Sequence, residues 1–467
     1  MSNQDFFPFR PTDKVTWKKQ VEKDLKGKDF EKTLVSTVWD SIRQEPYYDE
    51  SDTDDNVTAL SFHPNPEIPA LGARQWANAV EIFSSDPSSM NKQILHDLQL
   101  GADALVIYAE EEMNWEVILK QVHLEYITIY IKPIPSNLSS VFDFFEFLEN
   151  SGFAKEKLKG AILWSPADSL FETNSDWNEN LELAKKLIIK SSEYLHFHGL
   201  TANFTRYSDA GANGLSESVF GISELIELAD GLEKTGVSTN DCFNSLSFFI
   251  GVGKNHFPEI AKLKALRILI SDLANKFGVD LNAFQIEFIT TSSLWTKSLI
   301  DQNNNYIRQS YEAISAILGG GNTLLVRTVE RAKASELSRR VARNISSILK
   351  EESYLDKVMD PAAGSYYLES LIQNLLDTVT LEIEKLEAEG GWLKAFLDRS
   401  IHQKVRQERH DNQQAILENQ VSKVGVNRYQ ASGNLINNLP LKSEVEKDYQ
   451  LLPSRESYLV EQETLQA

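Results

Sequence analysis

The chain of 467 residues has a single cysteine, Cys242, and no long hydrophobic run. One cysteine excludes an intrachain disulfide and cysteine-rich zinc or iron–sulfur sites, and we expect a buried, inert thiol in a reducing compartment. No apolar run approaches the roughly 20 residues that span a bilayer. The first residues, MSNQDFFPFRPTDK, lack the basic, apolar and small-residue segments of a secretory signal. The sequence therefore predicts a cytoplasmic protein without membrane association.

Positive charge is also scarce. Lysine and arginine number 47 against 68 aspartates and glutamates, which gives a net charge of −21. This balance excludes a general binder of nucleic acids or anionic membranes, because both need a basic surface, but it leaves room for a local pocket that binds a phosphorylated small molecule. Disorder is excluded as well, since hydrophobic residues make up 42% of the chain, with 8 Trp, 15 Tyr and 23 Phe.

The middle of the chain alternates short β-prone runs with helical patterns. The clearest helix has apolar residues at spacings of three and four from Ile260 to Phe277, which form one stripe of an amphipathic helix. Such alternation over about 250 residues predicts an α/β fold, a (β/α)8 TIM-type barrel. A doubly wound open sheet is the alternative, and periodicity does not separate the two. The β-runs are residues 102–108, 126–131, 161–164, 198–204, 247–250, 284–289 and 323–326.

Segments with other patterns flank the predicted barrel, which covers residues 61–345. Residues 1–60 form an extended N-terminal arm, rich in aromatics but with too little core of its own, so we expect it to lie against a partner or the main body. Residues 346–467 form a helical C-terminal extension and a polar tail. Within this extension, the turn at residues 360–364 interrupts the helices and Ser365 caps the next one.

Glycine-rich and acidic stretches offer candidate binding loops. Residues 251–256 (GVGKNH) follow a strand and open a helix, but the dinucleotide fingerprint needs a third glycine where His256 stands, so a tight turn is favoured over a phosphate loop. Residues 319–321 (GGG) predict a helix C-cap and turn. The acidic loop 49–55 is favoured as solvated, because Val57 occupies the position where a calcium loop needs glycine.

Histidines offer one candidate metal site. His196 and His198 alternate on one strand and share a face, as in a metal-dependent barrel hydrolase. Only His256, His402 and His410 follow them, the last two in the helical extension, so satisfied or exposed histidines are the favoured interpretation. Taken residue by residue, the sequence predicts a barrel without an evident catalytic set.

Several blocks of the chain together resemble the methylmalonyl-CoA mutase family. Residues 17–30, followed by Pro46-Tyr47-Tyr48, resemble the N-terminal arm of the family's small subunit. One block would be weak support, whereas this ordered set extends over nearly the full length. The other blocks are residues 246–263 (LSFFIGVGKNHFPEIAKL), 342–344 (ARN) with 349–352, 360–369 (DPAAGSYYLE) and 424–429 (VGVNRY).

The resemblance implies an adenosylcobalamin-dependent isomerase that interconverts methylmalonyl-CoA and succinyl-CoA. In that family the barrel interior accommodates the acyl-CoA chain, and a C-terminal domain holds the cobalamin with the histidine of an Asp-x-His-x-x-Gly motif. None of the 8 histidines of this chain has an aspartate two positions before it. The resemblance therefore implies that this chain has no cobalamin-binding domain and no cofactor, and that adenosylcobalamin binds the partner chain.

Positions that match the family's substrate pocket are altered. Catalytic chains carry a Tyr-His pair just before an Ala-Gly-Ala segment, whereas residues 204–212 read FTRYSDAGA, with Arg206 or Ser208 in place of the histidine. Neither is an equivalent acid. Residues 74–76 (RQW) resemble an Arg-Gln-Tyr segment, with Trp76 in place of a radical-steering tyrosine. The resemblance implies no catalytic residue, and the vestigial pocket positions are Arg74, Gln75, Trp76, Arg206, Tyr207, Ser208 and Asn255.

These departures indicate the small, non-catalytic subunit of a heterodimer in propionate metabolism. Such a chain would be inactive alone and would act as a scaffold for a homologous large subunit that binds cobalamin and substrate. Two other interpretations stay open. One is the substrate-binding barrel of an acyl-CoA mutase whose cobalamin domain is a separate polypeptide, and the other is a barrel hydrolase that uses His196 and His198.

Overall fold

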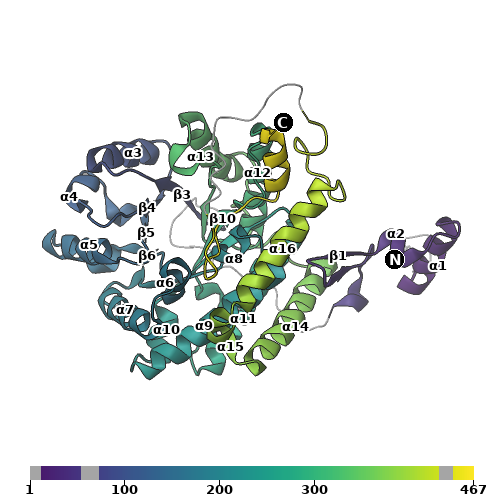
Figure 1. Cartoon of the computed structure of the whole chain (residues 1–467), viewed down its shortest axis with the longest axis horizontal. Helices are drawn as coiled ribbons and strands as arrows, with labels where there is room; N and C mark the ends of the chain where they lie inside the picture. The colour runs from purple at the N-terminus through teal and green to yellow at the C-terminus, as the bar shows by residue number, and fades with distance from the viewer. Residues whose placement is uncertain (1–11, 54–72, 431–444, 467) are drawn as a thin grey trace, which may run out of the picture.

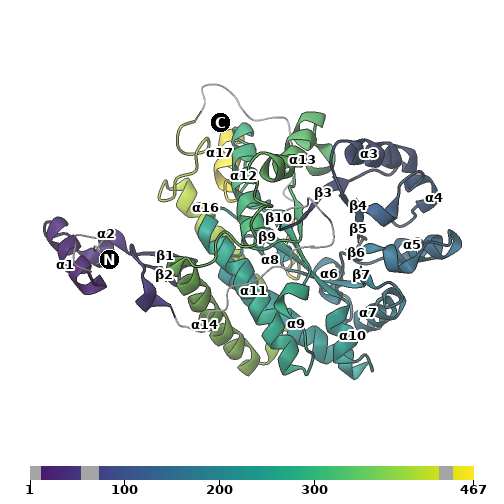
Figure 2. The ribbon, with the colours of Figure 1, turned by 180° about the vertical axis from the view of Figure 1, so that it is seen from behind.

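The computed structural model describes residues 12–53, 73–430 and 445–466, and its centre is a parallel β-sheet that closes on itself (Figures 1 and 2). The nine strands follow the order β7-β6-β5-β4-β3-β11-β10-β9-β8. At the two ends of this order, β7 pairs with β6 and β8 pairs with β9. Only Gly199 separates β7 from β8, so the two are halves of one strand. The sheet is therefore an eight-position barrel, as the sequence predicts.

The barrel strands agree with the predicted β-runs at most positions. Two predicted starts are wrong. Tyr126 of the run 126–131 belongs to the 3-10 turn η2, and β5 begins only at Thr128. Residues 284–285 of the run 284–289 belong to the 3-10 turn η4 (Ala283–Gln285), which Asn282 and Gln285 close as a capping box, and β10 begins only at Phe288. The strands are β3 (Ala77–Ile82), β4 (Ala104–Tyr108), β5 (Thr128–Lys132), β6 (Lys159–Ile162), β7 (His196–His198), β8 (Leu200–Asn203), β9 (Leu246–Val252), β10 (Phe288–Ser292) and β11 (Thr323–Leu325).

Helices surround the barrel (Figure 1). The predicted apolar stripe lies on α11, where Ile260, Leu263, Leu266 and Ile270 are at most 1% exposed. The helices are α3 (Pro87–Gln99), α4 (Trp115–Ile118), α5 (Ser139–Asn150), α6 (Pro166–Thr173), α7 (Trp177–Ser191), α8 (Thr205–Asp209), α9 (Gly214–Lys234), α10 (Thr239–Asn244), α11 (His256–Lys276), α12 (Asn303–Leu318) and α13 (Glu336–Glu351). Shorter 3-10 turns are η2 (Leu124–Tyr126), η3 (Lys155–Lys157) and η5 (Arg331–Lys333).

The C-terminal extension is helical, as predicted, and packs on the barrel. Ser365 caps α14, since its hydroxyl accepts the N–H of Leu368 at 3.4 Å. Helix α14 then packs against α11 and α9. The helices are α14 (Tyr366–Ala388), α15 (Gly391–Leu397), α16 (Ser400–Leu417) and α17 (Tyr458–Gln466). In the ranges that the structure describes, none of the helices has the length and apolar character that crossing a bilayer requires.

The N-terminal arm meets the body through a small hairpin, while its helices stand away from the barrel (Figures 1 and 2). On the hairpin, Val38 and Ile42 are buried in a cluster with residues of α11 and α14. The ring of Trp39 lies against Gly214, where an added Cβ would meet it at 2.4 Å. The arm consists of α1 (Lys14–Asp24), α2 (Phe30–Leu34), β1 (Ser36–Val38), β2 (Ile42–Gln44) and the turn η1 (Glu50–Asp52).

Candidate functional site

Side chains fill the interior of the barrel. From β5, the hydroxyl of Tyr130 lies 2.6 Å from that of Thr323 on β11. Also from β5, Nζ of Lys132 lies 5.3 Å from the ring centroid of Phe249 on β9. Both β11 and β9 are three positions from β5 around the barrel, so these contacts cross its axis. The buried residues that pack together there are Ala79, Ala104, Val106, Tyr130, Ala161, Leu163, Phe249, Ile289 and Leu325.

Arg206 and Tyr207 lie on α8, just after β8, at the carboxyl end of the barrel strands. The guanidinium of Arg206 donates hydrogen bonds to Glu224 and Asp168, each at 2.7 Å. Tyr207 donates its hydroxyl to the same Glu224 at 2.6 Å and accepts from the indole of Trp392 at 2.8 Å. Burial opposes ionisation of Asp168, but the charge of Arg206 outweighs it and lowers the pKa. Arg206 is therefore tied into a buried structural network.

Ser208 packs against the predicted glycine-rich loop. Its hydroxyl donates to Glu217 at 3.0 Å, and the same carboxylate accepts the N–H of Gly251 at 3.3 Å and pairs with Lys262 at 2.5 Å. Burial raises the pKa of Glu217 to about 7. An added Cβ at Gly251 would meet the Ser208 hydroxyl at 2.5 Å, so the glycine permits this close approach. The loop forms a tight turn between β9 and α11, and Asn255 stands at the start of α11, half-buried.

Residues 74–76 lie at the other end of the barrel, just before β3. Arg74 donates to the carbonyl of Gly321 at 3.1 Å, and the indole of Trp76 donates to Ser346 on α13 at 3.0 Å. Gln75 and Trp76 line a cavity of about 1190 Å³ at the amino ends of the strands. The structure therefore does not bring residues 74–76 together with residues 206–208.

His196 and His198 line the same amino-end cavity. His196 is exposed, whereas burial lowers the pKa of His198 to about 4. Sites of barrel enzymes form at the carboxyl ends of the strands, so this location does not favour the hydrolase interpretation. Within the described ranges, no group of three or more histidine, cysteine, aspartate or glutamate side chains is arranged to hold a metal ion.

The remaining candidates from the sequence, which are Cys242, the glycine run and the acidic loop, have structural roles. Cys242 is 1% exposed and burial raises its pKa to about 12, which agrees with an inert thiol. Gly319 ends α12, and the following Gly320 has a φ of 101°, the conformation that a C-cap turn needs. In the acidic loop, Asp49 and Asp52 cap the 3-10 turn η1. The remaining residues of the calcium-loop pattern, which the sequence did not favour, lie outside the described residues, Val57 among them.

Residues of the C-terminal tail, which sequence reasoning missed, lie across the carboxyl ends of the strands. The N–H groups of Ser454 and Glu456 donate to the carbonyls of Asp209 and Trp295 at 2.8 and 2.9 Å, and the hydroxyl of Ser457 donates to the backbone carbonyl of Lys297 at 3.2 Å. These partners follow β8 and β10. The tail therefore covers part of the face on which barrel enzymes place their sites.

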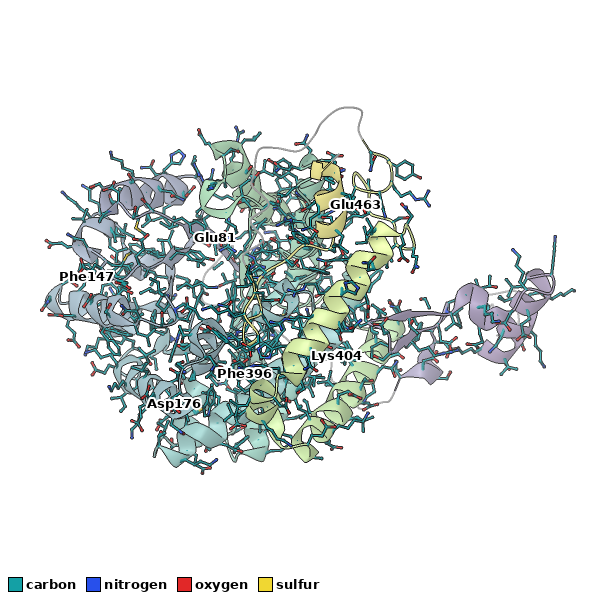
Figure 3. All side chains as sticks on the ribbon, in the orientation of Figure 1. Glu81, Phe147, Asp176, Phe396, Lys404 and Glu463 are labelled. Carbon is teal, nitrogen blue, oxygen red and sulfur yellow. The ribbon has the colours of Figure 1, made fainter. Side chains whose placement is uncertain are left out.

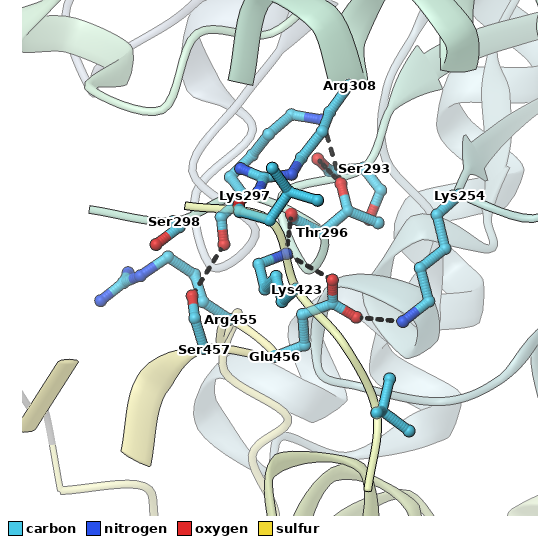
Figure 4. Close-up of polar contacts among 12 residues, drawn as sticks. Lys254, Ser293, Thr296, Lys297, Ser298, Arg308, Lys423, Arg455, Glu456 and Ser457 are labelled. Carbon is cyan, nitrogen blue, oxygen red and sulfur yellow. Dashed lines mark hydrogen bonds and ion pairs between the residues drawn. The ribbon is translucent and has the colours of Figure 1, made fainter. Parts of the chain in front are cut away.

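The carboxylate of Glu456 anchors this tail. It pairs with Lys254 at 2.6 Å, and it also pairs with Lys423, whose amine donates to the carbonyl of Thr296 at 2.6 Å (Figure 4). Burial raises the pKa of Glu456, but the two lysines outweigh it and lower the pKa to about 2. Glu456 is only 2% exposed. No pattern in the sequence indicated this burial, because the tail has no apolar periodicity.

The closed parallel sheet and its surrounding helices define a TIM-type α/β barrel, and comparison with known proteins gives its family. A family model for methylmalonyl-CoA mutase matches residues 96–451, well over half of the chain. The chain therefore belongs to the methylmalonyl-CoA mutase family.

Two similar proteins are named as small subunits. The methylmalonyl-CoA mutase small subunit of Porphyromonas gingivalis is 27% identical over 441 residues, which cover 91% of this chain and 71% of that protein. The small subunit of Streptomyces virginiae is 26% identical, with 80% and 62% covered. The methylmalonyl-CoA mutase of Cereibacter sphaeroides is 27% identical, with 88% and 64% covered. The match thus spans less than two thirds of the length of the last two proteins.

Proposed function

We propose that this chain is the small, non-catalytic subunit of a heterodimeric, adenosylcobalamin-dependent methylmalonyl-CoA mutase. The observation that carries the proposal is the pair of contacts across the barrel axis, Tyr130 with Thr323 and Lys132 with Phe249. A barrel that takes up an acyl-CoA chain needs an open axis, and these side chains occupy it. The names of two relatives as small subunits support the same role. A cytoplasmic location accords with the single cysteine.

Two features of the carboxyl face support a scaffold rather than a catalyst. Arg206 or Ser208 stands where catalytic chains have the histidine. The guanidinium of Arg206 is held by hydrogen bonds to Asp168 and Glu224. The tail segment around Glu456 covers neighbouring loops. In this proposal a homologous large subunit binds the substrate and adenosylcobalamin, whose cobalt–carbon bond supplies the radical. The chain described here contributes no residue to that chemistry.

Calorimetric titration of methylmalonyl-CoA into the isolated, folded chain tests the proposal. We expect no heat of binding, because the axis is filled. The same chain, co-expressed with a cobalamin-binding large subunit, is expected to co-purify with it and to yield an active mutase. Micromolar binding by the isolated chain would contradict the scaffold role and favour a substrate-binding barrel with its cobalamin domain on a separate polypeptide.

The arm is the surface that we propose for contact with the large subunit. Helices α1 and α2 stand away from the barrel, whereas the hairpin of residues 36–44 is packed against it. Deleting residues 1–35 therefore removes the projecting part and keeps the hairpin. We expect the truncated chain to keep its melting temperature and to lose co-purification with the large subunit. A complex that survives the deletion would place the contact elsewhere.

A further inference from the structure

At the mouth of the barrel, one lysine has no carboxylate partner. Lys132 is the last residue of β5 and is half-buried. Its Nζ lies 5.7 Å from the ring centroid of Tyr108 and 5.3 Å from that of Phe249. Among the residues that the structure describes, no ion pair or hydrogen bond engages this amine. Lys132 therefore differs from the other charged groups around it.

The two carboxylates that face Lys132 each form an ion pair with an arginine. Asp168, on α6, accepts from Arg206 at 2.7 Å. Asp209, on α8, accepts two hydrogen bonds from the guanidinium of Arg327, at 2.6 and 2.8 Å. A bidentate pair of this kind holds both partners in a fixed geometry. Asp209 cannot turn towards Lys132 without depriving the buried Arg327 of its carboxylate partner. Asp168 cannot do so without removing one of the two carboxylates that hold the buried Arg206, and either loss is costly.

Further charges near Lys132 are positive or already neutralised. Arg331 pairs with Glu81 at 2.9 Å, and the Tyr108 hydroxyl donates to the same Glu81 at 2.7 Å; Figure 3 labels Glu81. Burial lowers the pKa of Lys132 to about 8; Asp168 opposes this shift, and the charges of Arg331 and Arg327 add to it. An anion beside the amine would reverse this shift, since it stabilises the protonated form.

Lys132 borders a cavity of about 530 Å³ at the carboxyl ends of β3, β4 and β5. Phe83 and Pro133 give it an apolar wall, so it suits a ligand with a short apolar part. Glu110 and Glu172 also line it, and they disfavour a ligand with a second negative charge. The cavity thus combines one unneutralised cation, an apolar wall and an acidic border.

We propose that this cavity binds a small organic monocarboxylate, whose carboxylate pairs with Nζ of Lys132 and whose apolar part lies against Phe83 and Pro133. The site lies at the mouth and does not require an open barrel axis. It therefore goes beyond the scaffold role and does not depend on it. It gives the chain a ligand of its own, without a coenzyme A moiety.

Calorimetric titration of the full chain with acetate, propionate and butyrate tests the proposal. We expect at least one of the three to bind, propionamide and succinate not to bind, and Lys132→Met to weaken the binding at least tenfold. Lys120→Met, at an exposed lysine, is the matched control and is expected to bind as the unaltered chain does. Failure of all three carboxylates to bind, or equal binding by the Lys132→Met variant, would overturn the proposal.

A second measurement follows the ionisation of the Lys132 amine. Labelling with trace acetic anhydride at a series of pH values, followed by peptide mass spectrometry, gives the pH at which each lysine becomes reactive. We expect the midpoint of Lys132 near 8 without ligand and at least half a pH unit higher with the bound carboxylate, but unchanged with propionamide. A midpoint that the carboxylate leaves unchanged would overturn the proposal. Neither experiment involves methylmalonyl-CoA or the large subunit, so this result and that of the scaffold proposal are independent.

Discussion

Glu456 is a buried carboxylate that joins the C-terminal tail to the loop between β9 and α11 through Lys254, and to the segment after α16 through Lys423. The side chain of Lys423 is 4% exposed, whereas that of Lys254 is 43% exposed, so the pair with Lys423 dominates the energetics. An ion pair of this kind contributes little relative to a well-packed apolar pair. Removal of one partner is different, because it leaves the other charge buried and uncompensated.

Glu456→Gln is therefore expected to destabilise the protein by about 3 kcal/mol, since Lys423 loses its counter-charge. Urea unfolding gives the free energy, and hydrogen exchange of residues 454–461 shows whether the tail detaches. Glu463→Gln, at an exposed carboxylate of the same tail, is the matched control and is expected to change little. Equal stability of the two variants would mean that the pair does not hold the tail.

Acid should remove the contribution of Glu456. Its pKa is lowered to about 2 in the folded chain, below the usual value of about 4.3 for glutamate. The stabilisation is therefore fully present above about pH 4.3 and is lost as the pH falls towards 2. We expect the stability difference between the unaltered chain and the Glu456→Gln variant to shrink over that interval, as urea unfolding at several pH values would show. A difference that stays constant with pH would contradict the assigned pKa.

Among the elements, the hairpin β1–β2 decides how the arm is attached. Ile42 is 1% exposed and lies in a cluster with Ile260 and Leu371. The neighbouring Arg43 is exposed, and its ion pairs are with Glu31 and Glu45 of the arm. Ile42→Ala is expected to cost about 2–5 kcal/mol of packing at this junction. Hydrogen exchange of residues 36–44 should accelerate as the hairpin detaches. Arg43→Ala, on the opposite face of the same strand, should leave that exchange unchanged; similar acceleration in both variants would contradict the assignment.

The elements also show which sequence signals were informative. Strands such as β4 and β5 were predicted because parallel strands buried on both faces have near-continuous apolar runs. Strand β3 has no such run, since its residues are Ala-Asn-Ala-Val-Glu-Ile. Its charged residue, Glu81, pairs with Arg331. Helix α11 was predicted from its apolar stripe, whereas α17 lacks one. Elements held by polar contacts therefore escaped prediction.

For the whole molecule, the barrel closes at β7 and β8, which are separated only by Gly199. An added Cβ there would meet the Ser191 hydroxyl at 2.3 Å and the carbonyl of Leu187 at 3.0 Å on α7. Gly199→Ala is expected to lower the free energy of unfolding by about 1–3 kcal/mol, because the helix must shift. Ser191→Ala removes the hydroxyl, so the double variant should recover part of that loss. Urea unfolding of the single and double variants measures the coupling; additive losses would mean that the helix does not restrict this position.

The sequence by itself determined the class of fold, the helical extension and the family resemblance. Those features follow from local periodicity and from ordered blocks along the chain, which need no knowledge of distant contacts. It did not determine what the altered pocket positions do. Arg206 pairs with carboxylates 38 and 18 residues away, and Lys254 pairs with Glu456, 202 residues away.

Only the tertiary structure decided that the barrel axis is filled, that the tail covers part of the carboxyl face and that Lys132 stands without a carboxylate. Each of these depends on which side chains the closed sheet brings across from distant strands. A lysine at the end of a strand has the same sequence signature whether or not an acid faces it. The charge balance around Lys132 therefore depends on the closed barrel, because closure determines which side chains face this lysine.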